Sequence, residues 1–178
     1  MKNILFVFIG FFLLVGCASV KKEQTSTRRF EVPRNYSFVT EADFRRYEAD
    51  ILECIDYLES APVDDLSNDR RRINTFFLEW LTNVPYVHII IDGSVIELCD
   101  KNANFLITFM GGWTKHVLLH PDDQSEINGY FAGIESILAI YRKGNGVKSD
   151  EKIMGLIRIQ DEGKLMDWVL RQRNQNGT

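Results

Sequence analysis

Two histidines have a spacing that would suit metal chemistry. His116 and His120 lie four residues apart in a segment with helical patterning, which can place two imidazoles on one metal ion. A third ligand could come from His88, Asp122 or Asp123. The three residues between the histidines are hydrophobic, so the glutamate of a metalloprotease HExxH motif is missing. Histidines near a helix C-terminus also suit the helix dipole, and we therefore expect no cofactor.

Two cysteines lie on the apolar faces of predicted helices. An oxidising compartment would allow a disulfide between Cys54 and Cys99, whereas small buried hydrophobic residues would remain free thiols. The chain has no Cys-x-x-Cys motif and no identifiable histidine partner for either residue. The pattern therefore predicts no cysteine nucleophile.

Four glycines and a tryptophan could form a ligand groove. Gly111 and Gly112 interrupt a strongly apolar helix at a cost of about 1 kcal/mol each relative to Ala. That cost suggests the close approach of another backbone or of a ligand. Gly129 and Gly133 lie one turn apart on the next predicted helix, and Trp113 would complete the groove. Aromatic residues at helical spacing more often belong to a core, which is the alternative.

The remaining patterns do not indicate catalysis or nucleic-acid binding. Arg70-Arg71-Arg72 could contact an acidic partner, or could form a solvated helix face beside Asp64, Asp65 and Asp69. No P-loop, GxSxG, GxGxxG or paired-acid motif is present. A net charge of −4 provides no electrostatic footprint for nucleic acid. We therefore expect a binding protein that has no nucleic-acid partner and is not an enzyme.

Residues 1–16, MKNILFVFIGFFLLVG, have the pattern of a secretory signal peptide. Lys2 provides the positive start, and residues 4–15 are apolar apart from Gly10. A membrane-spanning helix needs about 20 apolar residues, so this run is too short to span a bilayer. Its length suits the hydrophobic region of a secretory signal.

Leu14-Val15-Gly16-Cys17, directly after this run, resembles the lipobox of bacterial lipoproteins. The resemblance implies that Cys17 carries a diacylglycerol, that the signal is cut before Cys17, and that the new amino group is acylated. Two or three acyl chains would hold the protein at a membrane, since one chain binds only marginally. By the family's sorting rule, Ala18 in place of Asp favours the outer membrane, with the domain facing the periplasm.

Residues 17–39 combine the lipidated cysteine with a polar segment that is interrupted by Pro33 and predicted to be a flexible tether. Arg28 and Arg29 in this segment could contact anionic lipid head groups, or could be ordinary solvated charges. Residues 40–173 form one predicted domain, and residues 174–178 a frayed tail. The membrane, reached through the lipid anchor, and an envelope protein are the expected partners.

Apolar residues recur at helical spacing through residues 40–173 and predict a compact all-α domain of six or seven helices with αα-hairpins. Thr40 is the expected first N-cap, while Pro62 and Pro85 end the first two helices. Ser149 is a further expected N-cap. Residues 86–99 are ambiguous: an extended piece at 86–91 and then a short helix is favoured over a hairpin at Asp92-Gly93.

The pattern from Trp80 through Gly111-Gly112-Trp113 to Gly133-Ile134-Glu135 is similar to that of small uncharacterised secreted bacterial proteins. That resemblance implies no activity. We expect a lipid-anchored protein-interaction or envelope-assembly module. The alternatives are a metal-binding enzyme that uses His116 and His120, and a carrier for a small apolar ligand.

Overall fold

The computed structural model describes residues 29–123 and 125–176, which form eight helices and no strand. The all-α prediction is therefore confirmed. No helix within the described ranges is both long enough and apolar enough to span a bilayer. The predicted signal peptide, Cys17 and most of the predicted tether lie outside the described residues. The helices are α1 Glu41–Arg46, α2 Glu48–Ser60, α3 Asn68–Asn83, α4 Gly93–Cys99, α5 Phe105–Leu119, α6 Glu126–Lys143, α7 Glu151–Asp161 and α8 Leu165–Asn176.

Side-chain caps define the start of most helices. Thr40 accepts a hydrogen bond from the backbone N–H of Asp43, whose carboxylate accepts in return from the N–H of Thr40. This capping box confirms the predicted N-cap. Ser67 and Ser125 cap α3 and α6 with their side chains, which accept hydrogen bonds from the backbone N–H groups of Arg70 and Asn128. Helix α7 is capped by Asp150 instead of the expected Ser149.

The first predicted helix is divided in two. The backbone leaves the helical geometry at Tyr47, which ends α1 and precedes α2. The side chain of Tyr47 is buried, so packing of this ring accompanies a break that apolar periodicity alone does not reveal. This break accounts for a count of eight helices instead of six or seven.

The chain between α3 and α4 contains no strand. Residues 87–92 are irregular, and α4 begins directly after Asp92. The carboxylate of Asp92 accepts a hydrogen bond from the backbone N–H of Val95, 3.1 Å away. Asp92 is thus a helix N-cap, which confirms the short helix. The alternative of a hairpin at Asp92-Gly93 is wrong.

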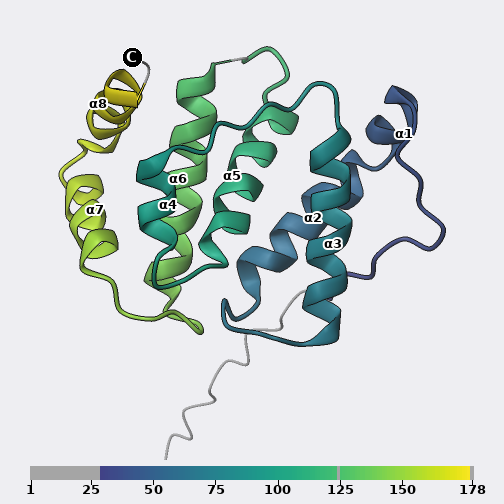
Figure 1. Cartoon of the computed structure of the whole chain (residues 1–178), viewed down its shortest axis with the longest axis horizontal. Coiled ribbons are helices and arrows are strands. Elements are labelled where there is room, and N and C mark those ends of the chain that lie inside the picture. The colour runs from purple at the N-terminus through teal and green to yellow at the C-terminus, as the bar shows by residue number, and fades with distance from the viewer. Residues whose placement is uncertain (1–28, 124, 177–178) are drawn as a thin grey trace, which may run out of the picture.

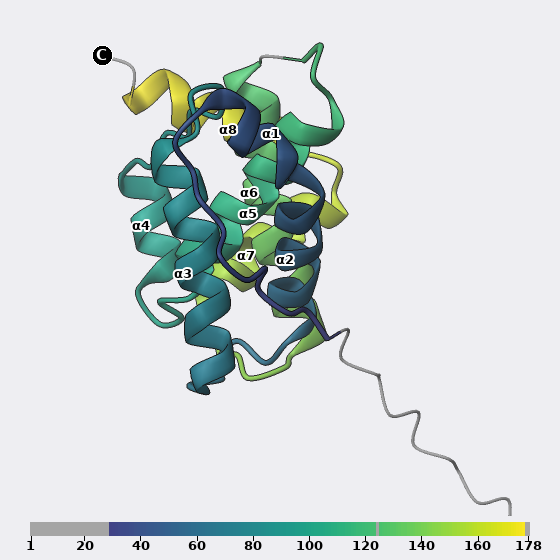
Figure 2. The ribbon, with the colours of Figure 1, turned by 90° about the vertical axis from the view of Figure 1, so that its right-hand side faces the viewer.

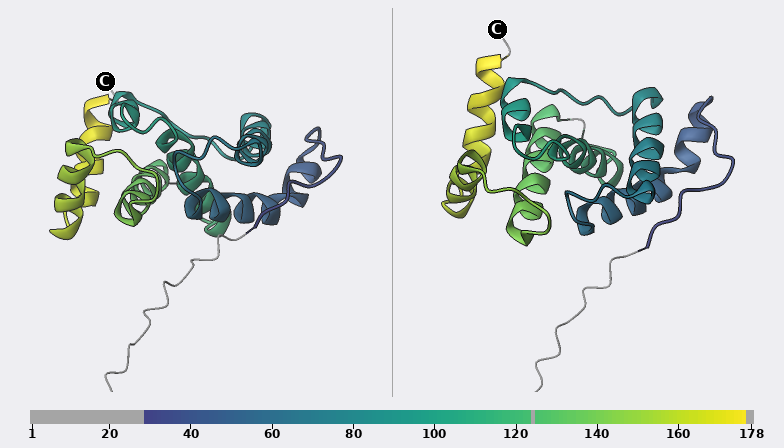
Figure 3. Two further views of the ribbon diagram at one scale, coloured as in Figure 1. Left: turned by 90° about the horizontal axis from the view of Figure 1, so that it is seen from below. Right: turned by 60° about the horizontal axis from the view of Figure 1, so that its bottom comes forward.

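Helices α5 and α6 pack side by side at the centre of the domain (Figure 1). Helices α1, α2 and α3 lie on one side of this pair, while α7 and α8 lie on the other, as the two views of Figure 3 also show. Buried residues on the two sides form separate hydrophobic clusters. Met110 and Val117 of α5 pack against both clusters, so α5 joins the two sides.

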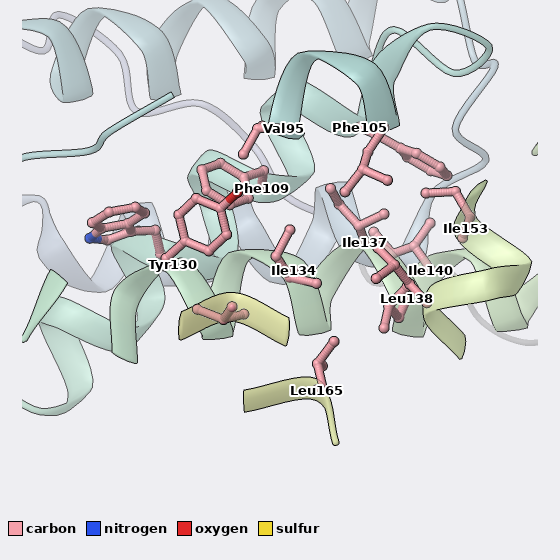
Figure 4. Close-up of a cluster of buried hydrophobic side chains, with 14 of the residues drawn as sticks. Val95, Phe105, Phe109, Tyr130, Ile134, Ile137, Leu138, Ile140, Ile153 and Leu165 are labelled. Atoms are coloured by element: carbon pink, nitrogen blue, oxygen red, sulfur yellow. The ribbon is translucent and has the colours of Figure 1, made fainter. Parts of the chain in front are cut away.

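We call the cluster around α4–α8 the C-terminal cluster. Its buried side chains converge between α4, α5, α6, α7 and α8 (Figure 4). They are largely aliphatic, with four aromatic rings on α5 and α6. The buried members are Val63, Val95, Leu98, Phe105, Phe109, Trp113, Tyr130, Ile134, Ile137, Leu138, Ile140, Ile153, Leu156, Leu165 and Val169.

We call the cluster around α1–α3 the N-terminal cluster, and aromatic rings dominate it. Phe76 is fully buried and contacts the rings of Phe30, Tyr36 and Phe38 at centroid distances of 6.0, 4.9 and 5.7 Å. The buried members are Phe30, Phe44, Tyr47, Ile51, Cys54, Ile55, Leu58, Ile73, Phe76, Phe77, Trp80, Val84 and Val87.

The segment before α1 belongs to this cluster and is not a free tether. Residues 29–40 run along α3 without regular structure (Figure 2). Phe30 is only 8% exposed, and Tyr36 and Phe38 pack against the same core. The predicted tether, residues 17–39, was therefore too long at its C-terminal end, because three aromatic side chains stabilise this segment against the domain.

Candidate functional site

The four glycines of the predicted ligand groove lie between helices instead of around a ligand. A Cβ atom on Gly133 would lie 2.6 Å from the ring of Phe109 and 2.8 Å from its carbonyl oxygen. On Gly129 it would lie 2.3 Å from Trp113 Nε1, and on Gly112 it would lie 2.7 Å from the carbonyl oxygen of Ala132. These residues therefore allow the close approach of α5 and α6.

Gly111 and Trp113, the other two residues of the predicted groove, are also buried against protein atoms. Gly111 is buried against Ile55 of α2, and Trp113 is 2% exposed with its ring against Phe109 and Tyr130. The predicted groove formed by these glycines and Trp113 was wrong, since protein atoms fill the space. Close approach of another backbone, the alternative reason for the Gly111-Gly112 pair, is confirmed at Gly112, whereas Gly111 meets only the side chain of Ile55.

A different concave surface lies beside this interface. We call it the α2–α5–α6 groove; it has a volume of about 500 Å³ and is open to solvent. Gly112 is the one predicted groove residue that lines it. Its lining combines apolar residues such as Leu119, Ala132 and Ile140 with polar residues, which include Glu59, Lys115, His116, His120, Glu135, Ser136 and Lys143.

A hydrogen-bonded set of charged groups crosses this groove. Lys115 Nζ donates to Asp56 Oδ1 at 2.7 Å and to Glu59 Oε2 at 3.2 Å. Ser136 Oγ donates to the other carboxylate oxygen of Glu59, and Lys143 Nζ donates to its backbone carbonyl. The groove thus presents fixed positive and negative groups to a ligand.

The ion pairs raise the pKa of Lys115. Partial burial opposes its charged form, but the hydrogen bonds to Asp56 and Glu59 and their negative charges outweigh that effect. Ser136 donates its hydrogen bond to a carboxylate and not to a histidine. Within the described residues the groove therefore lacks a serine–histidine pair for nucleophilic catalysis.

The two predicted histidines lie together at one end of this groove. Their rings stack with centroids 4.7 Å apart and planes 27° from parallel. His120 Nδ1 lies 3.0 Å from the carbonyl oxygen of His116, and His116 Nε2 lies 3.1 Å from Asp123 Oδ2. Each of these two ring nitrogens faces an acceptor and so carries the proton.

In this geometry His116 and His120 do not form a metal site. Lone pairs of imidazole nitrogens lie in the ring plane, so stacked rings do not direct them at a common point. Among the described residues, no group of three or more His, Cys, Asp or Glu side chains could hold a metal ion. His88 and Asp122 are exposed, and His88 lines a separate pocket of about 110 Å³ with Asp123.

Asp123 fixes the end of α5 instead. Its carboxylate accepts hydrogen bonds from the backbone N–H of Ser125 at 3.0 Å and from the side-chain amide of Asn128 at 2.8 Å. These bonds, followed by the bond to His116, lower the pKa of Asp123. The aspartate thus connects the end of α5 to the beginning of α6.

The two cysteines belong to different clusters and are free thiols. Cys54 Sγ donates to the carbonyl oxygen of Ile73 in the N-terminal cluster, and Cys99 Sγ donates to that of Val95 in α4. Of the two alternatives, a disulfide between Cys54 and Cys99 or two free thiols, the structure shows the free thiols. Burial raises the pKa of both thiols, that of Cys99 to about 11.

Two further side chains, Arg70 and Trp168, have their surroundings defined only by the tertiary structure. Arg70 is 2% exposed and donates to the carbonyl oxygen of Pro62 at 3.1 Å, so it is not part of a solvated helix face. Trp168, which is half-buried, lines a second groove of about 520 Å³ between α4, α7 and α8. The backbone N–H of Arg70 donates to the capping hydroxyl of Ser67, but the burial of its side chain depends on the loop that precedes α3.

No protein-family model, no curated protein and no solved structure matches this chain. Its resemblance to bacterial lipoproteins therefore rests on Leu14-Val15-Gly16-Cys17, the motif itself.

Proposed function

We propose that this chain is a lipid-anchored protein of the bacterial envelope whose helical domain binds a partner. The observation that carries the anchor is the sequence Leu14-Val15-Gly16-Cys17 after an apolar run of signal-peptide length. The lipid on Cys17 holds the chain at a membrane. Ala18 favours the outer membrane, with the domain in the periplasm.

Replacement of the lipidated thiol tests the anchor. The Cys17→Ala variant loses palmitate labelling, and the protein leaves the membrane fraction. Cys99→Ala is the matched control, because it removes a thiol of the folded domain and leaves the anchor in place. Unchanged membrane partitioning of Cys17→Ala, or equal release of both variants, contradicts lipid attachment at this residue.

We assign partner binding to the α2–α5–α6 groove. Its support is the set of fixed charges around Glu59 and Lys115 on an open concave surface of about 500 Å³. Such groups provide directional hydrogen bonds and ion pairs to a polar segment of another protein. The absence of a serine–histidine pair or metal group among the described residues favours binding over catalysis.

In-cell photocrosslinking tests this assignment. A photoreactive residue in place of Glu135, which is exposed and lines the groove, captures a discrete envelope protein. The same residue in place of the exposed Arg171 on α8 does not. Ala139→Trp fills the groove from its exposed side and abolishes the adduct. Equal adducts from both positions, or an adduct that Ala139→Trp leaves unchanged, contradict this assignment.

A further inference from the structure

The segment 29–36 and the first half of α3 together form a surface rich in arginine. We call it the arginine surface, and it contains two adjoining grooves that share Val32 and Arg72. The smaller groove, about 270 Å³, is lined by residues that include Arg29, Arg34, Glu31 and Asp69. The larger, about 580 Å³, is lined by Val32, Tyr36, Asn68, Arg71, Arg72 and Thr75.

Positive charge exceeds negative charge on this surface, although the whole chain has a net charge of −4. No carboxylate lines the larger groove. Arg72 pairs with Asp69 at 3.3 Å, and Arg29 lies 3.9 Å from Glu31. All four side chains of these pairs are more than half exposed, so the pairs contribute little and can exchange partners.

Two guanidinium groups on the arginine surface have no carboxylate partner among the described residues. Arg71 donates a hydrogen bond to the neutral side chain of Asn68. Arg34 is exposed and makes no ion pair within the described part of the chain. Guanidinium groups bind phosphate oxygens through paired N–H donors, so Arg34 and Arg71 are suited to phosphate groups.

The position of these arginines is determined by packing. Phe30 and Tyr36 are held against Phe76, which fixes the backbone on both sides of Arg34 against α3. Arg71 belongs to the first turns of α3, which Ser67 caps. The surface is thus a feature of the folded domain and not of a free N-terminal tail.

The length of chain before the domain identifies the occupant. Eleven residues separate Cys17 from Arg29, and a chain of that length reaches at most about 40 Å. Since Arg29 is itself part of the arginine surface, a lipid on Cys17 keeps this surface close to the bilayer. We propose that the arginine surface binds the anionic phospholipid head groups of the membrane that anchors the chain. This proposal rests on the lipid anchor proposed above.

Fluorescence energy transfer from the domain to the bilayer measures this docking. Full-length anchored protein carries a donor dye at Thr75→Cys, an exposed position in the larger groove, in a Cys99→Ser background. A second preparation carries the donor at Asn174→Cys, which is exposed on α8. The vesicles contain a rhodamine lipid in phosphatidylcholine alone, or in equal parts of phosphatidylcholine and phosphatidylglycerol.

We expect higher transfer from position 75 on the vesicles with phosphatidylglycerol, and a decline from about 0.1 M to about 1 M salt as the charges are screened. Each arginine near an anionic surface contributes about fivefold to docking, so the loss of Arg34 and Arg71 shifts the docking equilibrium at least about 25-fold. Arg34→Glu/Arg71→Glu therefore abolishes the lipid-dependent difference. Arg158→Glu/Arg171→Glu, with the same charge change on α7 and α8, retains it.

Docking through the arginine surface is contradicted by any of three results. These are equal energy transfer on both kinds of vesicle, a larger lipid-dependent difference at position 174 than at position 75, and equal loss of that difference in both double variants. Flotation with phosphatidylcholine vesicles tests the lipid anchor alone, and a chain that does not float with these vesicles contradicts the anchor. In that case, co-flotation with phosphatidylglycerol vesicles tests the arginine surface separately. If Arg34→Glu/Arg71→Glu then co-floats as well as the unchanged protein, the arginine surface does not bind anionic lipid.

Discussion

The N-terminal and C-terminal clusters lie on either side of α5 and are held together in different ways. In the N-terminal cluster, Phe76 joins a non-helical segment to α3 through ring contacts with Phe30 and Tyr36. In the C-terminal cluster, Gly129 and Gly133 allow two helix backbones to approach closely. The N-terminal cluster depends on large aromatic rings, whereas the helix contact in the C-terminal cluster depends on glycines. Truncation of a ring should therefore damage the first, and enlargement of a glycine should damage the second.

The different packing of the two clusters also explains where the two proposed binding surfaces lie. Ring packing in the N-terminal cluster fixes the irregular segment 29–36 and, with it, the arginine surface. Close packing in the C-terminal cluster leaves Gly112 and Ser136 at the edge of the α2–α5–α6 groove. The arginine surface thus depends on the N-terminal cluster, whereas the α2–α5–α6 groove joins α2 of that cluster to the α5–α6 pair.

The largest expected effect is removal of the central ring of the N-terminal cluster. Phe76→Ala should lower the free energy of unfolding by about 3 to 5 kcal/mol, because a fully buried aromatic side chain leaves a cavity. Urea denaturation measures this loss. Release of the segment 29–36 should also speed tryptic cleavage after Arg34. A loss below about 1 kcal/mol with unchanged cleavage would show that this cluster does not hold the segment.

A small increase in size should damage the C-terminal cluster. Gly133→Ala is expected to destabilise the domain by about 1 to 3 kcal/mol, since the added Cβ meets the ring and carbonyl oxygen of Phe109. Gly155→Ala in α7 is the matched control, because its Cβ meets only the end of Arg158 at 3.8 Å. This control should gain about 0.5 to 1 kcal/mol from helix propensity. Thermal unfolding of both variants checks the sign, and a stabilising Gly133→Ala would refute the close approach.

The ion pairs between α2 and α5 join the two sides and should have a smaller effect. Lys115→Met is expected to cost about 1 kcal/mol, because the half-exposed lysine bonds both Asp56 and Glu59. The pKa of Lys115 is raised, so its stabilising contribution is complete below the ordinary value of 10.5 and disappears as the pH rises through the folded value. Chemical denaturation of both proteins from neutral to strongly alkaline pH measures the difference, which should shrink only at the alkaline end.

The smallest expected effect is on the reactivity of two thiols, one in each cluster, and involves no change in stability. Burial raises the pKa of Cys99 to about 11, compared with the ordinary value of 9.0. Near neutral pH, Cys99 should therefore react with iodoacetamide about 100-fold more slowly than an exposed thiol. Cys54 has no exposed surface and should react only when the N-terminal cluster unfolds. Mass spectrometry of alkylated peptides distinguishes them, and equal rapid labelling would contradict the burial of both.

Local sequence signals predicted most of the secondary structure. Thr40 and Ser125 stand where N-caps are needed, and Val84 before Pro85 ends α3. These features depend on hydrogen bonds between residues a few positions apart, which sequence spacing reveals. The break at Tyr47 was not predicted, because the apolar periodicity continues across it.

The predictions for the candidate sites were less successful because they depended on distant contacts. Gly112 was correctly singled out as a position of close approach, but its neighbour Ala132 lies on the opposite helix. Gly133 was assigned to a groove, whereas it lies against Phe109 of α5. The correct spacing of His116 and His120 did not reveal that their rings stack. Spacing along a helix determines which residues share a face, but not the direction of each side chain.

The sequence by itself determined the all-α class, most of the helix ends and the lipobox pattern, because each depends on neighbouring residues. Only the tertiary structure decided that the segment from Phe30 belongs to the domain, that Trp113 and Phe109 cover Gly129 and Gly133, and that Arg70 is buried while Arg71 is exposed. The physical reason is that burial and side-chain pairing depend on how helices pack, and packing joins residues far apart in the chain.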